Sequence, residues 1–132
     1  MDERLILEAG RVKDGLRVLV TGGGSGIGAS VVDALRSAGA KVFVCDIDPS
    51  TSPDHVADIS QGQQVEEMFR VIKRDLGGLD VLVNNVGIAG PAGLVDEIDP
   101  NDFDEVLRVN LSGTFRVTAC AVPLLRTADS GL

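Results

Sequence analysis

The segment from Thr21 to Gly28 (TGGGSGIG) restricts the fold of this chain more than any other. The residues before it, Arg17 to Thr21 (RVLVT), form a short apolar run typical of a buried strand. After it, apolar residues recur at helical spacing as far as Gly39, a typical helix end. These residues are Ile27, Val31, Ala34, Leu35 and Ala38. The segment therefore predicts a tight turn between a strand and an amphipathic helix.

A turn of this composition can hold a phosphate group. Glycine has no Cβ, so the backbone can turn sharply and approach an anion closely. The helix that follows directs its free N–H groups and the positive end of its dipole toward the turn. The GxGxxG spacing is matched only partly, by Gly24 and Gly26 with Ala29 in the third position. A glycine-rich turn without a ligand is the alternative. The residues expected to contact a dinucleotide are Thr21, Gly22, Gly24, Ser25, Gly26, Ile27 and Gly28.

An acidic residue stands where the second predicted strand, Lys41 to Cys45 (KVFVC), comes to its end. Asp46 follows Gly26 by 20 residues, a spacing at which a carboxylate accepts hydrogen bonds from the adenosine ribose. No Lys or Arg follows in Ile47, Asp48 and Pro49. We therefore expect NAD to be preferred over NADP, with Asp46 and Ile47 at the ribose. A solvated Asp at a strand end is the alternative.

The remaining segments continue to alternate between strand and helix. His55 to Ile59 and Asp80 to Asn84 (DVLVN) are predicted strands. Between them, one apolar helical face ends at Gly77-Gly78, and its residues are Val65, Met68, Phe69, Ile72 and Leu76. Asp99 as N-cap and Pro100 as first helical residue begin a long helix. It is predicted to run to about Leu125, with Pro123 kinking its end.

This order predicts an α/β protein in which parallel strands are joined by right-handed crossovers. We expect one domain over residues 1–132: a Rossmann-type, doubly wound parallel sheet, truncated to about four strands in the order 3-2-1-4, with helices on both faces. Residues 1–15 are predicted to be a polar lead-in. Only a Pro/Ser/Thr-rich loop joins Asp46 to His55, which is short for a parallel crossover. The strand at His55 is therefore the least strongly predicted element.

Composition and charge narrow the possible partners. The net charge of −8 argues against nucleic acid or an anionic membrane surface as a partner. No apolar run suggests a signal peptide or a membrane span, so we expect a cytoplasmic protein. Cys45 and Cys120 are expected to be buried free thiols. Acidic residues around Asp99 are expected to form a solvated helix N-terminus and not a metal site.

The glycine turn resembles that of the classical short-chain dehydrogenase/reductase family. The family pattern TGxxxGxG is matched by Thr21, Gly22, Gly26 and Gly28. Asp58-Ile59 resembles the family element whose Asp contacts the adenine amino group. A turn-forming Asp is the alternative reading of Asp58.

Two asparagine elements extend the resemblance over nearly the whole chain. Asn84-Asn85-Val86-Gly87 is similar to the family's Asn-Asn-Ala-Gly, which steadies the central sheet and lies along the cofactor, with Val86 in place of Ala. Asn110 resembles the helix Asn of the catalytic tetrad, which holds a water in the proton relay. Asparagines that cap a strand end, and a satisfied polar residue on a half-buried helix, are the alternatives.

The resemblance implies an oxidoreductase that interconverts an alcohol and a ketone with NAD, and a parent protein that is a homodimer or homotetramer. It also implies a downstream Ser and a Tyr-x-x-x-Lys pair, in which Tyr is the general acid/base. The chain contains no tyrosine and ends at Leu132. We therefore expect a chain truncated before these residues and inactive alone, with the Asp80–Asn84 strand as an exposed edge. A non-catalytic NAD-binding or interaction module is the alternative.

Overall fold

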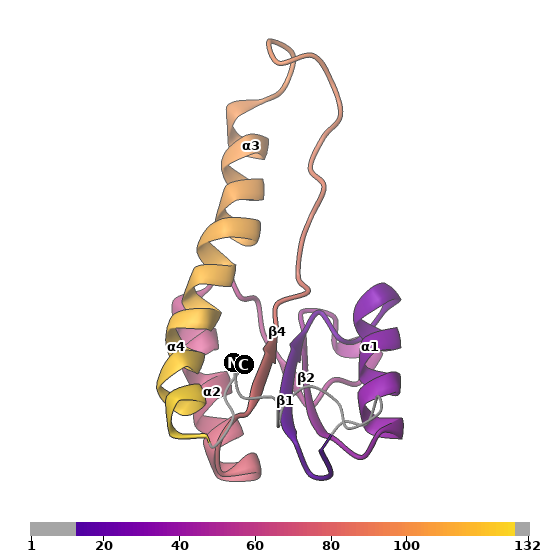
Figure 1. Ribbon diagram of the computed structural model, residues 1–132. Coiled ribbons are helices and arrows are strands. Elements are labelled where there is room, and N and C mark those ends of the chain that lie inside the picture. Colours follow the sequence, from indigo (N-terminus) through magenta and orange to yellow (C-terminus); the bar gives the residue numbers. More distant parts are fainter. Residues whose placement is uncertain (1–12, 129–132) are drawn as a thin grey trace.

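The computed structural model describes residues 13–128, so residues 1–12 of the predicted lead-in (1–15) lie outside the described part of the chain. The described chain forms a parallel sheet of four strands in the order β3-β2-β1-β4, with helices on both faces, which confirms the predicted fold (Figure 1). The elements are β1 (Arg17–Thr21), α1 (Gly26–Ser37), β2 (Lys41–Asp46), the 3-10 helix η1 (Pro49–Thr51), β3 (His55–Val56), α2 (Gly62–Leu76), β4 (Val81–Val83), α3 (Pro100–Leu107), the π-helix η2 (Arg108–Gly113) and α4 (Thr114–Thr127).

Alternate residues of β1 and β2 face two separate hydrophobic clusters, one on each side of the sheet. On the α1 side, the buried cluster consists of Val18, Val20, Val32, Ala40, Val42 and Val44. On the side of α2 and α4, it includes Leu19, Phe43, Cys45, Met68, Ile72 and Val117. Because side chains alternate along a strand, both faces of these central strands are buried. This explains the continuous apolar runs in the sequence.

The helix boundaries follow the local signals in the sequence. Asp99 accepts a hydrogen bond from the backbone N–H of Asn101 (2.8 Å), and Pro100 is the first residue of α3. Gly77 ends α2 with a φ of 73°, a left-handed conformation that glycine adopts without strain. Gly39 follows α1 with a φ of 93°. These predictions are confirmed.

Two predicted strands are too long. The connection after Asp46 is too short to return along β2, so β3 begins beside Cys45, and only two pairs form before β2 ends. The carboxylate of Asp54 instead accepts the N–H of Val44 (2.7 Å). After Val56 the chain bends into a turn, so the predicted strand His55–Ile59 is wrong beyond its first two residues. β4 covers only Val81–Val83 of the predicted Asp80–Asn84.

The predicted long helix is continuous from Pro100 to Thr127 but contains the π-helix η2, which sequence periodicity does not indicate. Its second half packs into the core, whereas α3 extends beyond the sheet beside the loop that follows β4 (Figure 1). A row of large apolar side chains on this helix is exposed: Phe103, Leu107, Leu111 and Phe115. The prediction that Ile27 lies on the apolar, buried face of α1 is wrong, because this residue is 79% exposed.

Both cysteines are free thiols, as predicted, although only Cys45 is fully buried and Cys120 is half-buried. Burial, and next the charge of Asp46, raise the pKa of Cys45 to about 12, so it remains a protonated thiol at neutral pH. Within residues 13–128, none of the helices combines the length and apolar character needed to span a membrane.

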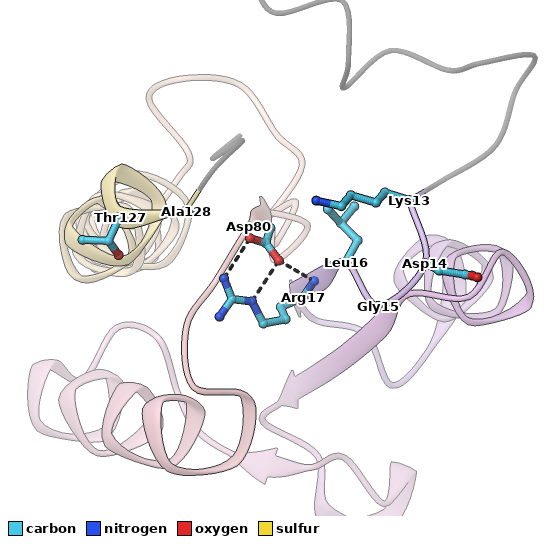
Figure 2. A pocket seen from close by; sticks show the side chains of 8 residues that line it. All are labelled: Lys13, Asp14, Gly15, Leu16, Arg17, Asp80, Thr127 and Ala128. Carbon is cyan, nitrogen blue, oxygen red and sulfur yellow. Dashed lines mark hydrogen bonds and ion pairs between the residues drawn. The ribbon is translucent and has the colours of Figure 1, made fainter.

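An ion pair joins the amino ends of β1 and β4. Figure 2 shows the Asp80 carboxylate accepting from the backbone N–H, Nε and Nη2 of Arg17, at 2.8, 2.9 and 2.9 Å. The hydrogen bonds from Arg17 hold the pKa of Asp80 below its ordinary value. The pair lies beside a cavity of about 220 Å³ at this end of the sheet. A carboxylate thus fixes the register between these two strands.

Replacing Asp80 by Asn is expected to lower the free energy of unfolding by about 1–3 kcal/mol at pH 7, because charge-assisted hydrogen bonds are lost. The folded-state pKa is depressed, so the stabilisation is present above the unfolded value of about 3.9 and is lost as the pH falls through the lower folded value. Urea unfolding of the wild type and of Asp80→Asn, at pH 7 and at successively lower pH, measures the difference in their free energies of unfolding. Asp33→Asn, at an exposed position in the middle of α1, is the control. A wild-type advantage over Asp80→Asn that does not shrink in acid would contradict the prediction.

Candidate functional site

A cavity of about 380 Å³ opens beyond the carboxyl ends of the strands. In open parallel sheets, ligands bind in this crevice, where the strand order reverses. Here the reversal lies between β1 and β4, because β2 and β3 continue on the other side of β1. Its lining residues are Gly22, Ser25, Asp46, Ile47, Ala57, Asp58, Ile59, Asn85, Val86, Gly87, Ile88, Glu105 and Val109.

The glycine turn forms one wall of this cavity. Gly22 and Gly26 have φ values of 64° and 54°, a region that favours glycine. A Cβ on Gly28 would clash with the carbonyl oxygen of Gly22 and lie 2.5 Å from Nδ2 of Asn85. At the N-cap of α1, the side chain of Ser25 makes no capping hydrogen bond. The first N–H groups of the helix are therefore available for an anion.

Asp46, at the end of β2, is buried, and two hydrogen bonds orient its carboxylate. Its Oδ2 accepts from the backbone N–H of Gly24 (2.9 Å), and its Oδ1 accepts from that of Asp48 (3.0 Å). A Cβ on Gly24 would lie 2.8 Å from Oδ2, so this approach requires glycine. A carboxylate has further lone pairs, and Asp46 lines the cavity. It can therefore accept additional hydrogen bonds there.

Asp58 lies in the turn that follows β3. Its Oδ1 accepts from the backbone N–H (2.9 Å) and the hydroxyl (2.6 Å) of Ser60. Burial raises the pKa of Asp58, but the hydrogen bonds from Ser60 and the charge of Arg108 outweigh it and leave the pKa below its ordinary value. Asp58 is therefore an ionised acceptor beside the cavity, and Ile59 adds an apolar surface to the lining.

The two asparagines after β4 differ in position. Nδ2 of Asn85 donates to the carbonyl of Gly22 (2.9 Å), which ties the glycine turn to the end of β4. Nδ2 of Asn84 instead donates to Oγ1 of Thr118 on α4 (3.1 Å), outside the cavity. Of this element, Asn85, Val86 and Gly87 line the cavity and Asn84 does not.

Asn110, in η2, also lies outside the cavity lining. Its Oδ1 accepts from the N–H of Ile88 and its Nδ2 donates to the carbonyl of Ile88, each at 2.8 Å. The amide therefore holds the segment after β4 against the long helix. π-Helical turns are often found at functional sites, and this one contains the asparagine predicted as catalytic.

The remaining predicted residues of the glycine turn are not among the lining residues: Thr21, Gly24, Gly26, Ile27 and Gly28. Thr21 is buried, and its hydroxyl accepts from the N–H of Asn85 (3.1 Å). Four lining residues were missed: Ala57, Ile88, Glu105 and Val109. Glu105 and Val109 are four residues apart and so share one face of the predicted helix. This spacing could have indicated that they line the same cavity. The cavity in Figure 2 is lined by none of the predicted site residues.

Comparison with known proteins agrees with this geometry. Residues 17–132 match the family model for short chain dehydrogenase. D-beta-hydroxybutyrate dehydrogenase of Cupriavidus necator is 33% identical, over 89% of this chain and 51% of that protein. L-fucose dehydrogenase of Bos taurus is 36% identical, over 83% of this chain and 44% of that protein. The chain thus spans about half the length of the relatives it matches.

Solved structures give the same result. A 3-ketoacyl-(acyl-carrier-protein) reductase from Brucella melitensis complexed with NADH has a TM-score of 0.80 and 30% identity, covering 84% of this chain and 50% of that one. Ligand-free aldohexose dehydrogenase of Thermoplasma acidophilum has a TM-score of 0.80 and 30% identity, covering 89% and 47%. The sheet, its switch point and the glycine turn define a Rossmann-type protein. The chain belongs to the short-chain dehydrogenase family, whose members are oxidoreductases that use nicotinamide cofactors.

Replacing Asn85 by Ala is expected to lower the free energy of unfolding by about 1–3 kcal/mol, because the carbonyl of Gly22 loses its partner in a partly buried place. Asn84→Ala, at the exposed neighbouring position, is the matched control. It should change the free energy of unfolding by less than about 0.5 kcal/mol. Urea unfolding measures both. Equal losses for the two variants would contradict the role assigned to Asn85.

Proposed function

We propose that this chain is the NAD-binding part of an oxidoreductase that interconverts an alcohol and a ketone by hydride transfer. The observation that carries the proposal is the buried Asp46 carboxylate, held by the Gly24 N–H beside the open N-terminus of α1. The family membership and the NADH complex of the Brucella reductase support it. The matched relatives carry enzyme names, so a non-catalytic module is not favoured.

The residues present fit a dinucleotide. A Cβ at Gly24 or Gly28 would lie less than 3 Å from other atoms of the protein, and Gly22 has a φ of 64°, so the turn requires glycine at these positions. A turn of glycines lets the backbone approach a pyrophosphate closely. The N-terminus of α1 would hold the pyrophosphate, with Thr21, Ser25, Gly26 and Ile27 shaping its approach. Asp46 and Ile47 would hold the adenosine ribose, and Asp58 and Ile59 the adenine.

The segment Asn84-Asn85-Val86-Gly87 would lie along the cofactor toward the nicotinamide, which accepts or donates the hydride when it is bound. Asn110 is the one member of the family's catalytic tetrad that has a counterpart in this chain. In this proposal Asn110 keeps the segment after β4 in place through its two hydrogen bonds to Ile88. By the family resemblance, Asn110 would lie near the nicotinamide of the bound cofactor.

The charges around the cavity support a preference for NAD. Among its lining residues are the three acids Asp46, Asp58 and Glu105, and none is Lys or Arg. A 2′-phosphate would meet the buried carboxylate of Asp46 without a compensating cation. Like charges brought together in this way cost several kcal/mol. The ribose hydroxyls of NAD can instead donate to the same carboxylate.

Calorimetry on the purified chain should show NAD binding at least about tenfold more tightly than NADP, which corresponds to about 1.4 kcal/mol. Asp46→Ala should narrow this ratio by weakening NAD binding and removing the repulsion of the 2′-phosphate. Asp75→Ala, which removes an exposed carboxylate on α2, is the control and should leave the ratio unchanged. If the wild type bound NADP more tightly, the role of Asp46 would be wrong.

We further propose a small-molecule alcohol or ketone as substrate, a cytoplasmic location, and a homodimer or homotetramer as the assembled protein. The exposed apolar row Phe103, Leu107, Leu111 and Phe115 supports an assembly, because large apolar patches on soluble proteins mark contact surfaces. Neither nucleic acid nor a membrane is proposed as a partner, in keeping with the net charge of −8.

The polypeptide of residues 1–132 is expected to bind NAD without measurable turnover. The family resemblance assigns proton transfer to a tyrosine, and this sequence has none. General acid–base catalysis typically supplies a factor of about 10²–10⁴. NADH absorbance, followed with D-beta-hydroxybutyrate and L-fucose as probes, tests this, with the Cupriavidus necator enzyme as positive control. Reproducible NADH formation by the polypeptide would refute the prediction.

A further inference from the structure

The turn Asp58–Ser60 is held by side chains from the long helix. Nη1 of Arg108 in η2 donates to the hydroxyl of Ser60. One end of α4 adds Arg116, whose Nη1 donates to the carbonyl of Ser60 (2.9 Å). Two arginines of one helix therefore donate to the hydroxyl and to the carbonyl of the same serine, whose N–H donates to Asp58.

Close packing accompanies these polar contacts. A Cβ on Gly113 would lie 2.9 Å from Cγ1 of Ile59, so glycine lets η2 come directly against the turn. Gly113, Ile59 and Ser60 are all buried. Since buried groups in a tight contact have few alternative arrangements, the helix and the turn are expected to move together.

A chain of hydrogen bonds runs from the helix to the Asp58 carboxylate. Glu105 accepts from Nε (2.8 Å) and Nη2 (2.6 Å) of Arg108, which fixes the plane of the guanidinium. Arg108 then holds Ser60, and Ser60 donates to Oδ1 of Asp58. Both ends of this chain, Glu105 and Asp58, line the cavity, whereas Arg108 and Arg116 do not.

We propose that Arg108 and Arg116 are positioning residues that hold the Asp58–Ser60 turn for an adenine ring, so that the long helix sets the selectivity for the 6-amino group. This inference rests on the proposed NAD binding. A carboxylate can accept from that amino group only if its free lone pairs keep their direction, and the hydrogen bonds to Ser60 provide this. Loss of the arginines should therefore reduce the preference of the protein for a base that carries the 6-amino group.

An exposed pair on α2 supplies a matched control. Arg70 contacts Glu67 three residues earlier, as Arg108 contacts Glu105, but unlike Arg108 it makes no hydrogen bond to the Asp58–Ser60 turn. Arg70→Ala thus removes the same charge and the same kind of helix pair as Arg108→Ala. It leaves the Asp58–Ser60 turn untouched. A difference between the two variants isolates the contact with the turn.

The test uses calorimetry with NAD and with nicotinamide hypoxanthine dinucleotide, in which a carbonyl replaces the 6-amino group and N1 carries a proton. The wild type should prefer NAD by about tenfold, the effect of one hydrogen bond to a charged group. Arg108→Ala and Ser60→Ala should reduce this ratio several-fold, and Arg108→Ala/Arg116→Ala should bring it close to one. Arg70→Ala should retain it. A general loss of affinity or stability weakens the binding of both nucleotides equally. It therefore leaves the ratio of the two dissociation constants unchanged.

Amide hydrogen exchange without nucleotide provides the second measurement. Exchange at Ser60 and Gln61 should be faster in Arg108→Ala than in the wild type or Arg70→Ala. Both changes are required. A wild type that does not discriminate, an unchanged ratio in Arg108→Ala, or unchanged exchange would each overturn the inference while NAD binding stands. A wild type that binds neither nucleotide would overturn the proposed function, and with it this inference.

Discussion

The hydroxyl of Thr21 joins the carboxyl ends of β1 and β4, and the geometry of the cavity depends on this junction. It accepts from the N–H groups of Asn85 and Val86, at 3.1 and 3.4 Å, while Asn85 donates to the carbonyl of Gly22. The chain needs this bridge because the first residues after each strand can no longer be held by the ladder of the sheet. The bridge also explains the requirement for glycine at Gly28, which packs against that same carbonyl. The turn and the segment after β4 are therefore one structural unit, although they are far apart in the sequence.

Local patterns predicted most of the architecture, because strands, helices and caps depend on residues near each other in the chain. The bounds of β1 and the ends of α1 and α2 agree closely with the apolar spacing and the glycines. β3 was predicted too long, because its extent depends on how far a short connection can reach along β2, which periodicity does not contain. The π-helix was missed for a similar reason, since a shift from i−4 to i−5 hydrogen bonding leaves no mark in the apolar pattern.

For the candidate site, the sequence indicated which side chains take part, but it did not indicate the groups that orient those side chains. Asp46 and Asp58 could be named from their spacing, yet both carboxylates are directed mainly by backbone N–H groups and one serine. Backbone donors carry no sequence signal of their own, because every residue except proline has one. Asn84 and Asn85 show the same limit. They are adjacent and chemically identical, but alternation along the chain sends one toward the glycine turn and the other toward α4.

The long helix links the hydrophobic core to the cavity. Its α4 half is fixed by the buried Val117 and Ala121, whereas α3 extends beyond the sheet (Figure 1). The residues that touch the Asp58–Ser60 turn, Arg108, Gly113 and Arg116, come from η2 and the adjoining end of α4, close to this anchored part. The same helix supplies Glu105 and Val109 to the cavity and holds the segment after β4 through Asn110. A rigid element that contacts both sides of a crevice fixes their separation. Because the α4 half is packed into the core, η2 and the start of α4 are held in a fixed place against the Asp58–Ser60 turn.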